Sequence, residues 1–112
     1  MGTWGFGNFQ NDAALDYVEG IADQLRSQLQ APTEIEDLLM LIAQVDMLRV
    51  LVEHCNARPP EEAELIALRD ACLAIFDEEK EEFYSTPEDA AERRSIIAKT
   101  FRKFLKVRKD WD

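Results

Sequence analysis

Apolar residues recur at intervals of three and four along most of the chain, which is the spacing that places them on one face of an α-helix. Only four prolines and four glycines are present, and this scarcity favours long helices over a fold with many turns. The pattern predicts an all-α, single-domain bundle over residues 1–112, with about four helices at 12–30, 34–56, 60–84 and 87–110.

The second predicted helix is apolar on more than one side. Its apolar residues are too widely spread for a single stripe, and a helix of that kind is usually central in a bundle. The polar residues Asp46, Arg49 and Glu53 are spaced so that they can pair along one wetter face. The apolar set that we expect to be enclosed is Ile35, Leu38, Leu39, Leu41, Ile42, Val45, Leu48, Leu51, Val52 and Cys55.

Three sequence signals predict helix starts. Asn11 or Asp12 can cap the first helix. Thr33 followed by Glu36 predicts a capping box for the second helix. Thr86 before Pro87 is typical of a helix start. Further along, Phe83 is expected on the apolar stripe of the third helix. Phe104 and Trp111 are expected on one apolar face of the fourth helix, where these two residues either extend the core or form a homodimer contact.

Charge is unevenly distributed along the chain. The net charge is −10, but residues 1–92 carry −16 and residues 93–112 carry +6. This segregation suggests two candidate interaction surfaces, one acidic and one basic. Alternatively both are ordinary solvated faces, with the basic helix lying beside acidic helices of its own chain. The residues concerned are Asp77, Glu78, Glu79, Glu81 and Glu82 on the third helix, and Lys99, Arg102, Lys103 and Lys106 on the fourth.

The first eleven residues combine three glycines with three large aromatic side chains. We expect this segment to be irregular but ordered, because three large aromatic side chains are costly to leave in water. Glycine permits close approach of a backbone to a ligand, so this segment and the helix start after it could bind a small ligand or an anion. Alternatively the aromatic rings close one end of the bundle, and Asp12 argues against an anion. The candidate binding residues are Trp4, Gly5, Gly7, Phe9, Asn11 and Asp12.

The same residues resemble the opening of a bacterial domain-of-unknown-function family, family 4259, whose members begin with a pattern like MGxWGxGxFxNDxAxD. The match covers about sixteen residues, with Phe6 as a minor departure. The resemblance implies a small bacterial helical protein. It brings no catalytic residue, cofactor or activity.

Few catalytic or metal-binding patterns are present. His54 is the only histidine, so a helix-bundle di-metal site with two ExxH motifs is excluded, and no cofactor is expected. Cys55 and Cys72 lack metal-ligand spacing and are expected to be buried thiols. Neither a secretory signal nor a membrane span is recognised, so the expected compartment is cytoplasmic.

These observations favour a non-enzymatic protein–protein interaction module, in one version similar to an immunity protein or antitoxin. The expected partner is another protein. Nucleic acid is disfavoured because the −16 region would repel it. A small-ligand or anion-binding module that uses the glycine–aromatic segment is the second hypothesis.

Overall fold

A computed structural model of the chain describes residues 12–111, and within these residues the fold is all-α. The sequence prediction of four helices is confirmed, and each helix begins and ends within about two residues of its predicted position. The four helices are α1 (Asp12–Gln28), α2 (Glu36–Cys55), α3 (Glu62–Phe83) and α4 (Pro87–Trp111). The predicted order of the glycine–aromatic segment lies outside the described residues.

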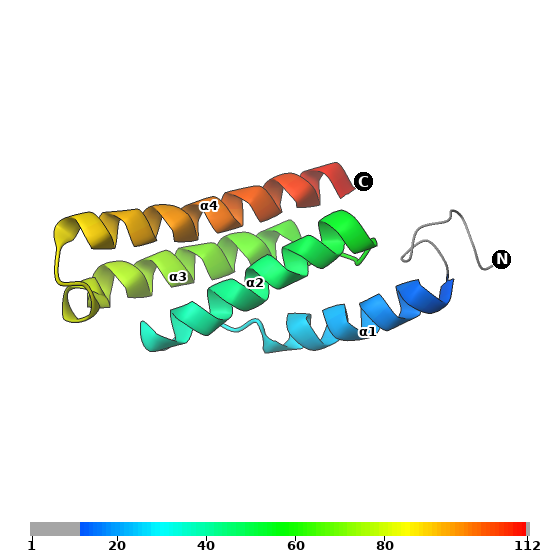
Figure 1. Cartoon of the computed structure of the whole chain (residues 1–112), viewed down its shortest axis with the longest axis horizontal. Coiled ribbons are helices and arrows are strands. Elements are labelled where there is room, and N and C mark those ends of the chain that lie inside the picture. Colours follow the sequence, from blue (N-terminus) through cyan, green and yellow to red (C-terminus); the bar gives the residue numbers. More distant parts are fainter. Residues whose placement is uncertain (1–11, 112) are drawn as a thin grey trace.

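The helices form a bundle in which α1 packs on α2, α2 on α4, and α4 on α3. Helices α2 and α4 run in the same direction, and α1 and α3 run in the opposite one (Figure 1). Of the described helices, α2 therefore has two principal neighbours, α1 and α4, and these cover only part of its circumference.

Large apolar side chains from all four helices meet in one core. Phe101 and Phe104 of α4 are fully buried, as are Val45 and Leu48 of α2, and Phe76 of α3 is almost so. No polar or charged side chain is buried among residues 12–111. Apolar burial is thus the main source of stability, and Phe104 extends the core instead of forming a dimer contact.

Two of the predicted helix starts have different outcomes. The Thr86 hydroxyl oxygen accepts a hydrogen bond from the backbone N–H of Asp89 at 3.1 Å, and Pro87 opens α4 as predicted. The predicted Thr33–Glu36 capping box is wrong. The hydroxyl of Thr33 instead donates to Asp37 at 3.2 Å, because the helix begins later than expected and Ile35 occupies the cap position without a side-chain cap bond.

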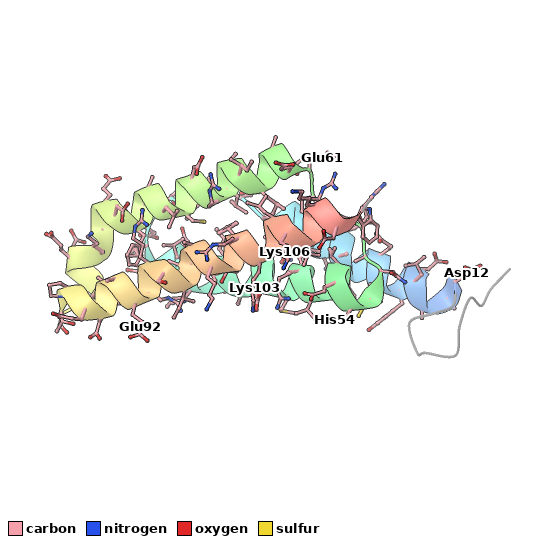
Figure 2. The ribbon with its side chains drawn as sticks, turned by 90° about the horizontal axis from the view of Figure 1, so that it is seen from above. Asp12, His54, Glu61, Glu92, Lys103 and Lys106 are labelled. Carbon is pink, nitrogen blue, oxygen red and sulfur yellow. The ribbon has the colours of Figure 1, made fainter. Side chains whose placement is uncertain are left out.

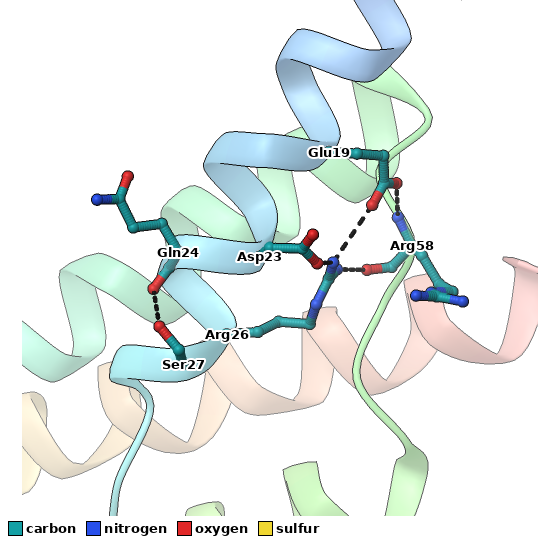
Figure 3. A network of polar contacts seen from close by, with 6 residues as sticks. All are labelled: Glu19, Asp23, Gln24, Arg26, Ser27 and Arg58. Atoms are coloured by element: carbon teal, nitrogen blue, oxygen red, sulfur yellow. Dashed lines mark hydrogen bonds and ion pairs between the residues drawn. The ribbon is translucent and has the colours of Figure 1, made fainter.

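A polar clasp fixes α1 against the loop between α2 and α3 (Figure 3). The Glu19 carboxylate accepts a hydrogen bond from the backbone N–H of Arg58 at 2.7 Å. The Arg26 guanidinium donates to the backbone carbonyl of Arg58 and to the carboxylates of Asp23 and Glu19. Just before this loop, Asn56 adopts the left-handed conformation (φ 62°) that ends α2.

The sequence overestimated the burial of two apolar residues, Leu39 and Phe83, which are 52% and 46% exposed. Trp111, for which the sequence left open either a place in the core or a homodimer contact, is 38% exposed. Phe83 and Trp111 are the last residues of α3 and α4. Leu39 lies on the side of α2 that faces away from the core. The helices of residues 12–111 include none whose length and apolar character would let it cross a membrane.

Candidate interaction surface

The side of α2 that faces away from the core carries a continuous row of apolar residues, here called the outer stripe. Exposed fractions are 52% for Leu39, 69% for Met40, 56% for Met47 and 38% for Val50, and Ala43 between them is also exposed. Spacings of three and four residues keep these side chains on one face of the helix. The outer stripe therefore presents apolar surface to solvent over several turns.

The opposite side of α2 is equally apolar and is buried. Leu41 is 5% exposed, and Val45 and Leu48 are fully enclosed against the neighbouring helices. The sequence prediction that α2 is apolar on more than one side is thus confirmed, but the inference that such a helix is central is wrong for its outer side. An apolar face that is left in water on a folded chain is typical of an interaction site.

A charged network borders the outer stripe along one edge. Arg49 binds Asp46 at 2.8 Å and Glu53 at 2.5 Å, as the spacing predicted. The hydrogen bond that Arg49 donates to Asp46 raises the pKa of the Arg49 guanidinium, which is only 13% exposed. Both carboxylates at this edge consequently have a cation beside them, which reduces the repulsion that they would exert on an approaching surface.

The two ends of the outer stripe differ in chemistry. Glu36 is the first residue of α2 and is exposed. His54 lies at the other end, where its side chain is 64% exposed and its Nε2 atom lies 3.8 Å from Glu53. About five turns of 3.6 residues separate Glu36 from His54, so both lie on one line along the helix, together with the apolar residues.

The acidic surface predicted on α3 is partly engaged within the chain. Both carboxylate oxygens of Asp77 accept hydrogen bonds from Arg94 of α4, at 2.8 and 3.0 Å. These hydrogen bonds, assisted by the charge of Arg94, hold the pKa of the Asp77 carboxyl below its usual range. The Glu79 carboxylate accepts the backbone N–H of Ile35 at 3.2 Å. The other acidic residues of the prediction, Glu78, Glu81 and Glu82, are exposed.

The basic surface predicted on α4 lies in solvent, and Figure 2 labels two of its residues, Lys103 and Lys106. Lys99 and Arg102 are exposed as well. Charge neutralisation between α4 and the acidic part of the chain is confirmed where Arg94 binds Asp77, and Arg108 also approaches Glu61 at 3.6 Å. Residues 1–92 and 93–112 are therefore partly complementary in charge through Arg94 and Arg108, neither of which belongs to the predicted basic surface.

The predicted ligand site falls almost entirely outside residues 12–111. Of its members, only Asp12 is described, as the exposed first residue of α1. Trp4, Gly5, Gly7, Phe9 and Asn11 lie before it, and the small-ligand hypothesis stays a prediction.

A groove of about 380 Å³ lies between the end of α1 and the start of α3. Leu29, Leu65 and Leu68 line it, together with Arg26. Arg26 is the only cation of the lining, and it is already bound to Asp23, Glu19 and the carbonyl of Arg58. An anionic ligand would have to displace this clasp, so the groove is a poor anion site.

The two cysteines are free thiols and are buried, as predicted. Burial raises the pKa of the Cys72 thiol to about 12, so this side chain is a core hydrophobe and a weak nucleophile. Within residues 12–111 no group of three or more His, Cys, Asp or Glu side chains is arranged to hold a metal ion.

Comparison of the chain with protein-family models, with curated proteins and with solved structures gives no match to any of them. The resemblance to family 4259 therefore stays a prediction.

Sequence reasoning missed the outer stripe as a candidate surface. The signal was present: Met40, Ala43, Met47 and Val50 repeat at helical spacing. Because the buried side of α2 is also apolar, the two stripes merge in the sequence into one broadly apolar helix. Only the packing of α1 and α4 on the same half of α2 distinguishes them.

Proposed function

We propose that this protein is a non-enzymatic protein–protein interaction module whose contact surface is the outer stripe of α2. The observation that carries the proposal is the exposure of Leu39, Met40, Met47 and Val50 along one face of a helix whose other face is buried in the core. Surfaces of this type bind a partner helix or an apolar groove, which contacts the side chains that are spaced three and four residues apart. An immunity or antitoxin-like role is one specific version.

The outer stripe supports the proposal better than the acidic segment of α3 does. Asp77 and Glu79 already have partners in the chain, and the remaining carboxylates are solvated. Exposed ion pairs contribute little to affinity, whereas desolvation of apolar side chains is the main driving force of association. Methionine adds to this because its flexible thioether adapts to irregular partner surfaces.

Site-specific photo-cross-linking tests this function. A photoreactive amino acid replaces Ala43, at the centre of the outer stripe, in the full chain expressed in the cells that make it. The control places the same group at Ala74, an exposed alanine of α3. We expect protein adducts from position 43 that are absent or far weaker from position 74.

Two results would contradict the proposal. Equal adduct yields at positions 43 and 74 would mean that the outer stripe has no special affinity for protein. Absence of any adduct at position 43, with the labelled chain folded and abundant, would mean that the outer stripe faces only solvent.

A further inference from the structure

The positions of the outer stripe are spaced symmetrically about Val45. Counted from Val45, the residues Met40 and Val50 lie five positions before and after it, and Ala43 and Met47 lie two positions before and after it. All four side chains are exposed. A surface with this order can meet a copy of itself in the antiparallel direction, since a two-fold axis near Val45 places each residue level with its counterpart.

The ends of the outer stripe complete this symmetry with opposite chemistry. Glu36 and His54 lie nine positions before and after Val45, and both are exposed. In the antiparallel arrangement each Glu36 carboxylate lies level with the imidazole of His54 in the other copy, so the pair forms twice. In a parallel arrangement Glu36 would lie against Glu36, which is repulsive.

The middle of the outer stripe also favours its own copy. The small side chain of Ala43 comes level with the large side chain of Met47, so two helices can approach closely at both sides of the axis. Along the edge towards α4, Arg49 holds both Asp46 and Glu53. No uncompensated carboxylate of that edge therefore opposes the second copy.

We infer that two copies of this chain pair through the outer stripes of α2, antiparallel, with Glu36 of each copy beside His54 of the other. This inference rests on the proposed function and names the partner as a second copy. The outer stripe from Glu36 to His54 is about 27 Å long at 1.5 Å per residue. One helix face of that length is below the standard size of about 800 Å² per partner, so we expect a weak, reversible dimer.

Sedimentation velocity of the full chain, from about 1 μM to about 500 μM, tests the pairing around the micromolar affinities expected of a small interface. We expect a monomer–dimer equilibrium in the wild type. Met47→Glu places four acidic groups close to the two-fold axis, together with Asp46, and should raise the dissociation constant at least about tenfold. The control Phe83→Glu makes the same change at an exposed apolar residue of α3 and should leave the constant unchanged.

The charged ends give a test that does not depend on removing apolar surface. His54→Glu and Glu36→Lys should each weaken the dimer, and the double variant should recover most of the loss because the pair is then reversed. Orientation is read from disulfide formation: a chain with Glu36→Cys should cross-link to a chain with His54→Cys, and neither should cross-link to itself. The native Cys55 and Cys72 are buried, so the wild-type chain measures the background level of cross-linking.

Three results would overturn the inference: a wild type that stays monomeric at the highest concentration, equal effects of Met47→Glu and Phe83→Glu, or self-cross-linking of Glu36→Cys as the main product. If the chain is monomeric but position 43 still cross-links to a different protein, the second copy is excluded while the proposed function stands. If neither a dimer nor a cross-link from position 43 is found, both the inference and the proposed function are wrong.

Discussion

Helices α2 and α4 run side by side in the same direction, yet they differ on the faces that point away from the core. The outer face of α4 carries Lys99, Arg102, Lys103 and Lys106, whereas α2 exposes its outer stripe of leucine, methionine, alanine and valine. Both inner faces are apolar. The charged side chains of α4 are favourably solvated by water or paired with acidic residues, whereas the exposed apolar side chains of α2 have no such favourable interaction with water. This difference is the reason that we place the proposed contact surface on α2.

The largest expected effect comes from the inner faces, where α2 and α4 are alike. Phe101→Ala removes a fully buried ring from α4, and we expect a loss of about 3–5 kcal/mol in the free energy of unfolding. Chemical denaturation measures it. Lys103→Ala, on the outer face of the same helix, should change the free energy by less than about 0.5 kcal/mol. Equal effects would mean that the burial of α4 is misassigned.

Two adjacent residues of α2 separate its inner and outer faces. Leu48 is fully buried and Met47 is 56% exposed. Leu48→Ala should cost about 2–5 kcal/mol, because a cavity is left in the core. Met47→Ala should cost less than about 1 kcal/mol when measured at a concentration where the chain is monomeric. A similar cost for both would contradict the exposure of the outer stripe.

A moderate effect on stability is expected at the polar clasp that holds α1 against the loop between α2 and α3. Glu19→Ala removes the acceptor for the backbone N–H of Arg58 and a partner of Arg26. We expect a loss of about 1–2 kcal/mol, as for other hydrogen bonds that involve a charged group. Glu78→Ala, which removes an exposed carboxylate of α3, is the control and should be nearly neutral in thermal denaturation.

The smallest effect concerns the ion pair that joins α3 to α4. Arg94 lowers the pKa of the Asp77 carboxyl, so the stability from this pair is present above the pKa of the unfolded carboxyl and is lost as pH falls through the lower folded value. Because the side chains are 43% and 44% exposed, we expect less than about 1 kcal/mol. Arg94→Met should therefore reduce stability at pH 7 slightly and leave it unchanged in strong acid.

Denaturation of Arg94→Met and the wild type across this acid range provides the check. A difference that stays constant down to the lowest pH would show that Arg94 contributes through packing instead of through charge.

The fold was predictable because apolar residues at helical spacing indicate four helices, and a local signal marks the start of α4. Thr86 and Pro87 mark the start of α4 by their own backbone and side-chain chemistry, whatever the rest of the chain does. The capping box failed at Thr33 because the carboxylate of Asp37, one position after Glu36, accepts hydrogen bonds from both the backbone N–H and the hydroxyl of Thr33. Such competition between neighbouring acceptors is decided by where the helix begins.

The candidate surface was not predictable, for a different physical reason. Val45 and Met47 are both apolar and only two residues apart, and the sequence does not say which of them the neighbouring helices cover. That choice depends on the crossing of α1 and α4 over α2, which is a tertiary property. Charge was the more visible signal, but Arg94 and Asp77 neutralise each other within the chain.

The most direct test of the outer stripe as a contact surface is methyl NMR of the full chain labelled with ¹³C at the methionine methyl groups. Met40 and Met47 both lie in the outer stripe and report on its centre and one half. We predict that both signals shift together as the protein concentration rises, and that the Met40 shift is lost in the Met47→Glu variant. If both signals stay unchanged with concentration and on addition of extract from the cells that make the protein, the outer stripe of α2 is not an interaction surface.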